Sequence, residues 1–215
     1  MNPNCKTLVL ILGGLTSVAL SGCVSLGPKG DPAALYRFGP DDPPSSAKAI
    51  GPLRPPVDLH VDLPVASSGD RILSASGARL AYLGGARWVT PAAVIFRNDL
   101  TLALASHSRF EPLEGAGHAG RHLSVHVLTF EVDYADGASG APTVHVVAAL
   151  SARNDADVDP ISMVIDARSA ASQNRVGAIV AAYGKAVAEV TDAAVVLVDA
   201  QSATSALIAV HPGGS

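Results

Sequence analysis

Two runs of alternating apolar and polar residues, joined by a short turn, constrain the fold of this chain most. Residues 121–134 alternate with the period of two that places successive side chains on opposite faces of a strand. Asp136-Gly-Ala-Ser-Gly140 has the composition of a turn, and residues 143–150 form the returning strand. We therefore predict a long β-hairpin, and the fold must contain a sheet.

The apolar residues of the first run change phase within the strand. Leu123, Val125 and Val127 are predicted to share one face, and a second set is predicted to share the other face. The second set is Leu128, Phe130, Val132 and Tyr134. The switch near Val127 indicates either a β-bulge or a strand centre that is buried on both faces.

Five shorter segments are also predicted to be strands. Residues 57–63 alternate with a period of two, which is typical of a half-buried strand. Residues 71–74 and 79–83 are two candidates around a glycine turn. Residues 162–167 are predicted to be an edge strand, and residues 35–38 can pair as a first strand.

Two segments have the three- and four-residue spacing of helices. Thr90 and Pro91 suit the cap and the first position of an amphipathic helix over residues 92–106. The apolar face of this helix consists of Ala93, Phe96, Leu100 and Leu104, with Arg97, Asn98, Asp99 and Thr101 between them. A second helix is predicted from about residue 176 to 191, with a stripe of Ile179, Ala182, Ala186 and Val190. Beyond residue 191, the alanines favour a helix and the valines favour a strand, so both structures remain possible for this segment.

These elements predict an α/β fold, a mixed β-sheet flanked by helices in an αβα sandwich-like arrangement. We assign residues 57–200 to a single domain and residues 201–215 to a C-terminal tail. Residues 24–56 hold eight of the fifteen prolines, which exclude a long helix or a central strand. We interpret residues 23–56 as a partly extended tether ahead of the domain.

The N-terminus has the parts of a secretory signal peptide, predicted over residues 1–22. One cation, Lys6, precedes an apolar run over residues 7–20, which is shorter than the roughly 20 apolar residues of a transmembrane helix. The ending Leu20-Ser-Gly-Cys23 resembles a lipobox, the cleavage signal of bacterial lipoproteins. The resemblance implies cleavage before Cys23, a thioether-linked diacylglycerol on its sulfur and acylation of the new amino group.

Lipidation of Cys23 implies a phospholipid membrane as a partner, because several acyl chains anchor stably where one does not. The resemblance also implies a location. An aspartate directly after the lipidated cysteine usually retains a lipoprotein at the inner membrane, but residue 24 is a valine. We therefore expect the protein at the periplasmic face of the outer membrane. The alternative is an ordinary signal peptide followed by a stray cysteine.

Removal of residues 1–22 would leave 193 residues with a net charge of −5 and Cys23 as the only cysteine. A periplasmic domain of this kind has no internal disulfide and must be stable through its core. The length suits one domain with a good-sized core. The mild acidity and the lack of a basic stripe argue against binding to nucleic acid.

No motif with catalytic chemistry is found. The sequence has no Gly-x-Ser-x-Gly, His-Glu-x-x-His or phosphate-binding glycine loop, so we expect a non-enzymatic protein without a cofactor. His118, His122 and His126 are spaced by four, but four residues span about 13 Å along a strand. Bonds to zinc are only about 2 Å long. We therefore expect no metal site and interpret these side chains as exposed strand and loop histidines.

A short acidic run resembles the start of a calcium loop. It consists of Asp155, Asp157 and Asp159, and Asp166 falls at the twelfth place. However, Pro160 occupies the position where the loop requires glycine, and the last ligand is not the usual glutamate. We interpret these groups as solvated loop carboxylates.

Arg87 and Trp88 are the candidate partner-binding residues. Trp88 is the only tryptophan, and it lies just before the predicted helix start at Thr90. In one interpretation it is a recognition residue at the edge of the sheet. In the other it is a partly buried ring that closes the core, as most tryptophans are well buried.

The order of these features resembles the ABC-type transport auxiliary lipoproteins, the family of the lipoprotein subunit of paraquat-inducible transport systems. In chain order, the features are the lipobox cysteine, Tyr36-x-Phe38, residues 57–63, Asp70-Arg-Ile-Leu73, Arg79-Leu-Ala-Tyr82, Ala86-Arg-Trp-Val-Thr-Pro91, the helix with Phe96 and Leu100, and residues 123–134 with Thr129-Phe-Glu131. The resemblance covers about residues 23–190, and its most specific part is residues 82–91. Residues 193–210 are longer and more apolar than the family pattern.

The resemblance implies a non-enzymatic outer-membrane component of a lipid-trafficking system. Such systems pair an ABC transporter or related permease with MCE-domain proteins, which form hydrophobic conduits across the periplasm. The lipoprotein would dock the conduit at the outer membrane, and self-association into a homo-oligomer is compatible with this role. The implied fold is a mixed sheet flanked by helices.

Two other classes of function remain open. One is a structural lipoprotein that supports the outer membrane or its assembly without moving lipid. The other is a hydrolase, which would require a deep pocket with converging Asp, His and Ser side chains.

Overall fold

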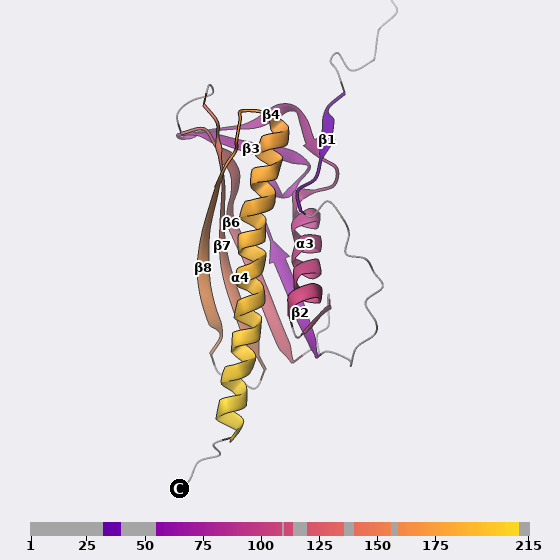
Figure 1. Ribbon diagram of the computed structural model, residues 1–215, viewed down its shortest axis with the longest axis vertical. Coiled ribbons are helices and arrows are strands. Elements are labelled where there is room, and N and C mark those ends of the chain that lie inside the picture. The colour runs from indigo at the N-terminus through magenta and orange to yellow at the C-terminus, as the bar shows by residue number, and fades with distance from the viewer. Residues whose placement is uncertain are drawn as a thin grey trace, which may run out of the picture. The chain divides into compact units, whose positions relative to one another are not determined.

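A mixed eight-stranded sheet organises the chain (Figure 1). The computed structural model describes residues 32–39, 55–108, 110–113, 120–135, 140–155 and 159–210, with the backbone alone for residues 202–210. The chain divides into two units, residues 1–32 and residues 33–215, and the fold below belongs to the second. The predicted signal peptide, Cys23 and most of the predicted tether lie outside the described residues.

The sheet branches at β6 (Arg121–Asp133). On one side β6 pairs antiparallel with β7 (Thr143–Asn154), which in turn pairs antiparallel with β8 (Ile161–Ala170). On its other side β6 pairs parallel with β2 (Pro56–Asp62) and, near its end, with β3 (Arg71–Ser76). The predicted hairpin and the predicted edge strand are therefore confirmed.

Three further strands extend the two branches. The antiparallel partner of β3 is β4 (Arg79–Trp88), and β1 (Ala34–Tyr36) lies parallel to the end of β4. The third, β5 (Glu111–Leu113), lies parallel to β2 and was not predicted from the sequence. The predicted strands at residues 35–38, 57–63, 71–74 and 79–83 are confirmed, and β3 and β4 run further than predicted.

A β-bulge explains the change of phase in β6. The pairing with β7 shifts between Val127 and Thr129, which leaves Leu128 as the extra residue, 58% exposed. One additional residue reverses the alternation. Phe130 and Val132 are therefore buried on the same side as Leu123, and the prediction that they share the opposite face with Leu128 is wrong. Of the two alternatives for the strand, the bulge is the correct one.

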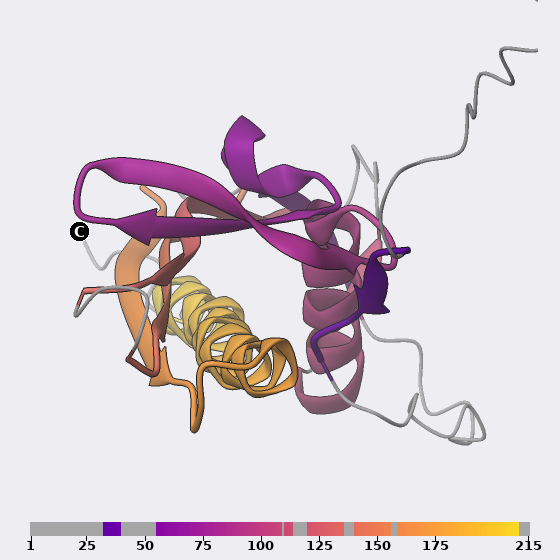
Figure 2. The same cartoon turned by 90° about the horizontal axis from the view of Figure 1, so that it is seen from above.

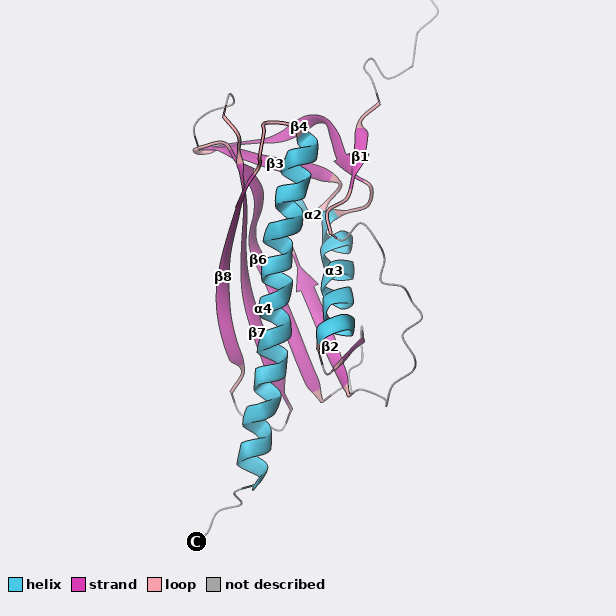
Figure 3. Ribbon diagram, in the orientation of Figure 1, coloured by secondary structure: helices cyan, strands magenta, loops and turns pink. Residues whose placement is uncertain are grey.

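The two long helices, α3 (Ala92–His107) and α4 (Val176–Val210), lie against the same face of the sheet (Figure 2). The rings of Phe96 on α3 and Tyr183 on α4 both contact Phe130 of β6, with centroid distances of 6.2 and 4.8 Å. A third helix, α2 (Val65–Ser68), is a single turn that was not predicted. Figure 3 shows α2, α3 and α4 beside the strands. The predicted α/β class, a mixed sheet flanked by helices, is confirmed.

Both helices differ in detail from the prediction. The cap of α3 is Pro91 with an extended ψ of 135°, and no side chain caps the helix, so the prediction of Thr90 as cap is wrong by one residue. Beyond residue 191, where strand and helix were both open, α4 continues as a helix and crosses residue 200. The reason is that buried residues keep the helical spacing there, at Val190, Ala194 and Val198.

Five aromatic side chains form the centre of the core, and we call them the aromatic cluster. They are Phe38, Trp88, Phe96, Phe130 and Tyr183, all 3% exposed or less. The indole of Trp88 meets Phe38 and Tyr183 edge-on, with centroid distances of 5.0 and 5.1 Å. Such edge-to-face contacts contribute about 0.5–1.5 kcal/mol beyond the area that they bury. The cluster joins β4, β6, both long helices and the segment that follows β1.

The buried hydroxyl of Tyr183 lowers the stability of this cluster. The ring is fully buried, and its oxygen has no hydrogen-bond partner among the described residues. Burial, and secondarily the charge of Glu131, raises the pKa of Tyr183, so the hydroxyl stays protonated. A buried hydroxyl without a partner costs about 1–3 kcal/mol.

Replacing Tyr183 by phenylalanine is therefore expected to leave the free energy of unfolding unchanged or to raise it by about 1 kcal/mol. Urea denaturation measures the change. Tyr134→Phe is the matched control. The hydroxyl of Tyr134 donates to Asn174 Oδ1 at 3.1 Å, and its loss is expected to cost about 0.5–1 kcal/mol. A loss of stability in Tyr183→Phe larger than in Tyr134→Phe would show that the Tyr183 hydroxyl has a partner.

Candidate functional site

Trp88 is a core residue and does not offer its ring to a partner. Its side chain is 2% exposed, because β4 and β1 place it against Phe38 and Tyr183. The interpretation of Trp88 as a recognition residue is therefore wrong, and the packing interpretation is correct. The burial is deeper than the partly buried ring that was expected.

Arg87 lies on the surface beside this core. Its Nη1 donates to Asp70 Oδ2 at 2.8 Å, and both side chains are about half exposed. The backbone N–H of Trp88 donates to the carbonyl oxygen of Asp70 at 2.7 Å. An exposed pair of this kind contributes about 0.2–1 kcal/mol. A partner-binding role for Arg87 stays a prediction.

The histidines on the sheet pair with carboxylates. His122 lies between Asp58 Oδ2 at 3.3 Å and Asp155 Oδ1 at 3.0 Å, and its side chain is only 18% exposed. The prediction of an exposed histidine is wrong for His122, because Asp58 stands directly opposite it on β2. His126 is half exposed and pairs with Asp62. His118 lies outside the described residues.

The acidic residues of the calcium-like run separate in the fold. Asp166 is on β8, where its Oδ1 lies 2.9 Å from His145 Nε2, and Asp155 contacts His122. Asp157 lies outside the described residues, and Asp159 is exposed. Within the part of the chain that the structure describes, no three His, Cys, Asp or Glu side chains are grouped to hold a metal ion.

A groove between α3 and α4 is a candidate site, with a cavity volume of about 560 Å³. Its walls are formed by Leu102 and Ala103 of α3 and by Ala181 and Ala188 of α4. The buried side chain of Val187 contributes to its floor. The volume falls in the range of about 300–1,000 Å³ that ligand pockets occupy. It is open along the surface.

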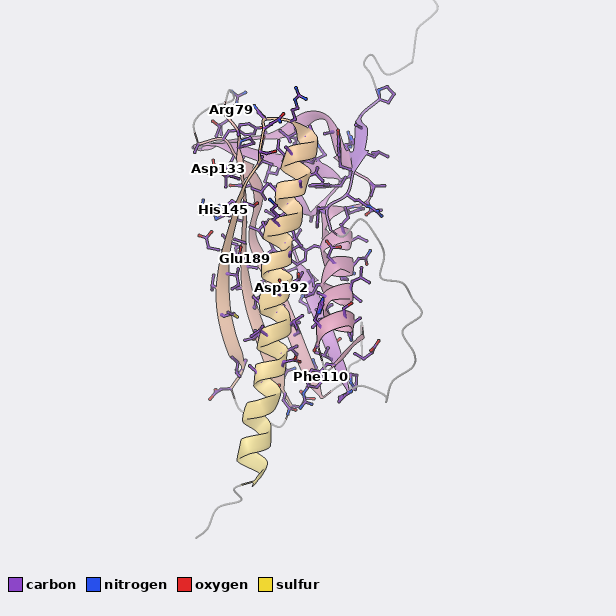
Figure 4. The ribbon with its side chains drawn as sticks, in the orientation of Figure 1. Arg79, Phe110, Asp133, His145, Glu189 and Asp192 are labelled. Atoms are coloured by element: carbon purple, nitrogen blue, oxygen red, sulfur yellow. The ribbon has the colours of Figure 1, made fainter. Side chains whose placement is uncertain are left out.

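Titratable residues stand along the groove. Asp99 and His107 come from α3, and Lys185 and Asp192 come from α4. Figure 4 labels Asp192 on the side of α4 that is turned toward α3. Below the groove, the hydroxyl of Ser108 donates to Asp199 Oδ1 at 2.9 Å and ties the end of α3 to α4. The site is thus an apolar slot with groups of both charges at its rim.

Asp99 is the unusual residue of this groove. Its carboxylate lies so close to Gly39 that a Cβ there would overlap it, and Gly39 has a φ of 99° that suits glycine. Its Oδ2 is buried and has no hydrogen-bond partner among the described residues. Burial raises the pKa of Asp99 from 3.8 to about 7, although the charge of Arg37 opposes the rise.

Asp99→Asn is expected to stabilise the protein at high pH and to have little effect at low pH. The pKa of Asp99 is raised on folding, so stability falls as the pH rises from about 4 to about 7. The full shift corresponds to about 4 kcal/mol, and solvent screening of this partly exposed group reduces it to about 2 kcal/mol. Urea unfolding of both proteins at pH 4.5 and pH 8, chosen as approximate limits of this window, measures the difference. An equal difference at both pH values would contradict the raised pKa.

The sequence did not point to this groove. Asp99 was placed among the polar residues of α3, and neither Lys185 nor Asp192 was singled out. The available signal was the small size of Ala103, Ala181, Gly184 and Ala188, which keeps the space between the helices open. The contact of α3 with α4 brings together residues about 80 apart in the chain, and no local pattern reports it.

No helix in the described part of the chain is long and apolar enough to cross a membrane.

Comparisons with known proteins concern the fold. No protein-family model matches the chain, and no curated protein matches it. The crystal structure of a protein from Xanthomonas campestris with the family designation DUF330 is similar, with a TM-score of 0.63 and 18% sequence identity, over 80% of this chain and 99% of that one. The crystal structure of an uncharacterized protein has a TM-score of 0.58 and 15% identity, over 76% of this chain and 96% of that one. At these identities the likeness establishes a shared fold.

Proposed function

We propose that the protein is a non-catalytic outer-membrane lipoprotein that docks an MCE-type lipid-transport conduit at the periplasmic face of the outer membrane. The observation that carries the proposal is the apolar N-terminal run that ends in Leu20-Ser-Gly-Cys23. Lipid on Cys23 would fix one end of the chain to the membrane. The proline-rich residues that follow would give the domain reach into the periplasm.

The ordered motifs add support from the folded domain. Phe38, Trp88, Phe96 and Phe130, which come from separate motifs, meet in the aromatic cluster. Residues from these separate motifs thus form one core, which supports the resemblance as a likeness of fold. The docking role depends on the resemblance and on Cys23, since these four aromatic residues are buried.

Deletion of the gene tests the proposal. We expect a changed distribution of phospholipid between the inner and outer membranes and an increased sensitivity to detergent. Complementation with the wild-type gene should restore both, and complementation with Cys23→Ser should restore neither. Unchanged lipid distribution in the deletion strain, with altered envelope strength alone, would favour a structural lipoprotein and contradict the proposal.

A further inference from the structure

The groove between α3 and α4 has the form of a slot for an extended chain. Its lining runs from Asp99 to His107 on α3, which is about 12 Å, and from Ala181 to Asp192 on α4, which is about 16 Å. The helices run alongside one another (Figure 1), and the lining residues of the groove follow both of them. An elongated apolar slot fits a hydrocarbon chain better than a compact ring system.

Small side chains create the space. Ala103, Ala181, Gly184 and Ala188 line the groove, and Ala181 and Ala188 are themselves exposed. A single large side chain at either exposed alanine would occupy much of the slot without entering the core. Covering exposed apolar surface of this kind with a ligand favours binding, because the surface is removed from water.

The rim carries both charges on one helix. Lys185 and Asp192 of α4 are exposed and line the groove, and Asp99 faces them from α3. A lysine ammonium binds phosphate as a point charge, and a carboxylate accepts hydrogen bonds from an ammonium group. This arrangement complements a head group that contains both a phosphate and an amine. A fatty acid has a carboxylate that could pair with Lys185, but it has no ammonium group to pair with an aspartate.

We infer that the groove holds an acyl chain of a zwitterionic phospholipid of the ethanolamine type, with its phosphate at Lys185 and its ammonium at Asp99. The inference rests on the proposed function and deepens it, because it makes the docking domain a direct carrier of lipid. The alternative occupant is an apolar helix of a partner protein. Such a helix could fill the same slot, but it has no head group to pair with the charged residues.

Binding of lysophosphatidylethanolamine, below its micelle concentration, tests the inference. The protein is the exported chain with Cys23→Ser, which carries no lipid of its own. We expect saturable binding by isothermal titration calorimetry and an affinity about tenfold lower for lysophosphatidylglycerol, which lacks the amine. Absence of binding, or equal affinity for both lipids, would overturn the assignment.

Two substitutions locate the site. Ala188→Trp fills the slot and is expected to weaken binding by about tenfold or more. Val196→Trp is the matched control, because Val196 is exposed on the same helix and does not line the groove. Circular dichroism verifies folding, and Ala181→Trp replaces Ala188→Trp if the latter does not fold. Equal binding by the groove variant and the control would place the lipid elsewhere.

Failure of this inference and failure of the proposed function are distinguishable. If lipid binds in the groove but the deletion strain keeps its lipid distribution, the site is real and the transport role is wrong. If no lipid binds and the deletion strain loses its lipid balance, the protein docks the conduit without holding lipid.

Discussion

Replacing Trp88 by alanine is expected to lower the free energy of unfolding by about 4 kcal/mol, within the range of large-to-small changes in a core. The indole contacts Phe38, which follows β1, and Tyr183 of α4, so its loss would leave a cavity in the aromatic cluster. No disulfide would compensate, because Cys23 is the only cysteine after residue 22. Urea denaturation followed by circular dichroism measures the effect.

Leu80→Ala is the control for this substitution. Leu80 is on the same strand, and its side chain is 58% exposed, so we expect a loss below about 0.5 kcal/mol. If Trp88→Ala cost no more than Leu80→Ala, the indole would not close the core as described. Its role as a contact for a partner would then have to be considered again.

Replacing Cys23 by serine is expected to remove the protein from the outer membrane. The serine cannot form the thioether to diacylglycerol, so the mature chain would lose its acyl groups and with them its stable membrane affinity. Labelling of cells with radioactive palmitate, followed by separation of inner and outer membranes, measures both consequences. We expect no label on the variant and none of it in the outer-membrane fraction.

Cys5→Ser is the matched control, because Cys5 lies within the predicted signal peptide. This variant should be labelled and localised as the wild type is. Persistent palmitate on Cys23→Ser, or its normal localisation, would contradict a lipid anchor at Cys23 and favour an ordinary signal peptide.

The elements with strong periodicity could be predicted from the sequence. The alternation in β2 and β6 and the three- and four-residue spacing in α3 are local signals, and each element formed where it was expected. The change of phase at Val127 even located the bulge. The assignment of faces failed because a bulge reverses the alternation, and the sequence could not decide between that and a strand buried on both sides.

The features that depend on distant contacts could not be predicted. Burial of Trp88 was one of two interpretations of the sequence, and the choice between them required its contacts with Phe38 and Tyr183, which are 50 and 95 residues away in the chain. The groove requires α3 and α4 to lie side by side, and the pKa of Asp99 follows from the burial that this packing causes. In α4 the valines weakened the helix prediction beyond residue 191, although the buried spacing from Val190 to Val198 continues.

Affinity purification of the tagged, lipidated protein after cross-linking in intact cells tests the docking role most directly. A tagged, unrelated outer-membrane lipoprotein serves as the reference, and mass spectrometry identifies the captured proteins. We predict enrichment of an MCE-domain protein, together with subunits of its ABC transporter or permease, and loss of that enrichment in Cys23→Ser. Recovery of other envelope proteins without any MCE-domain protein would contradict the proposal.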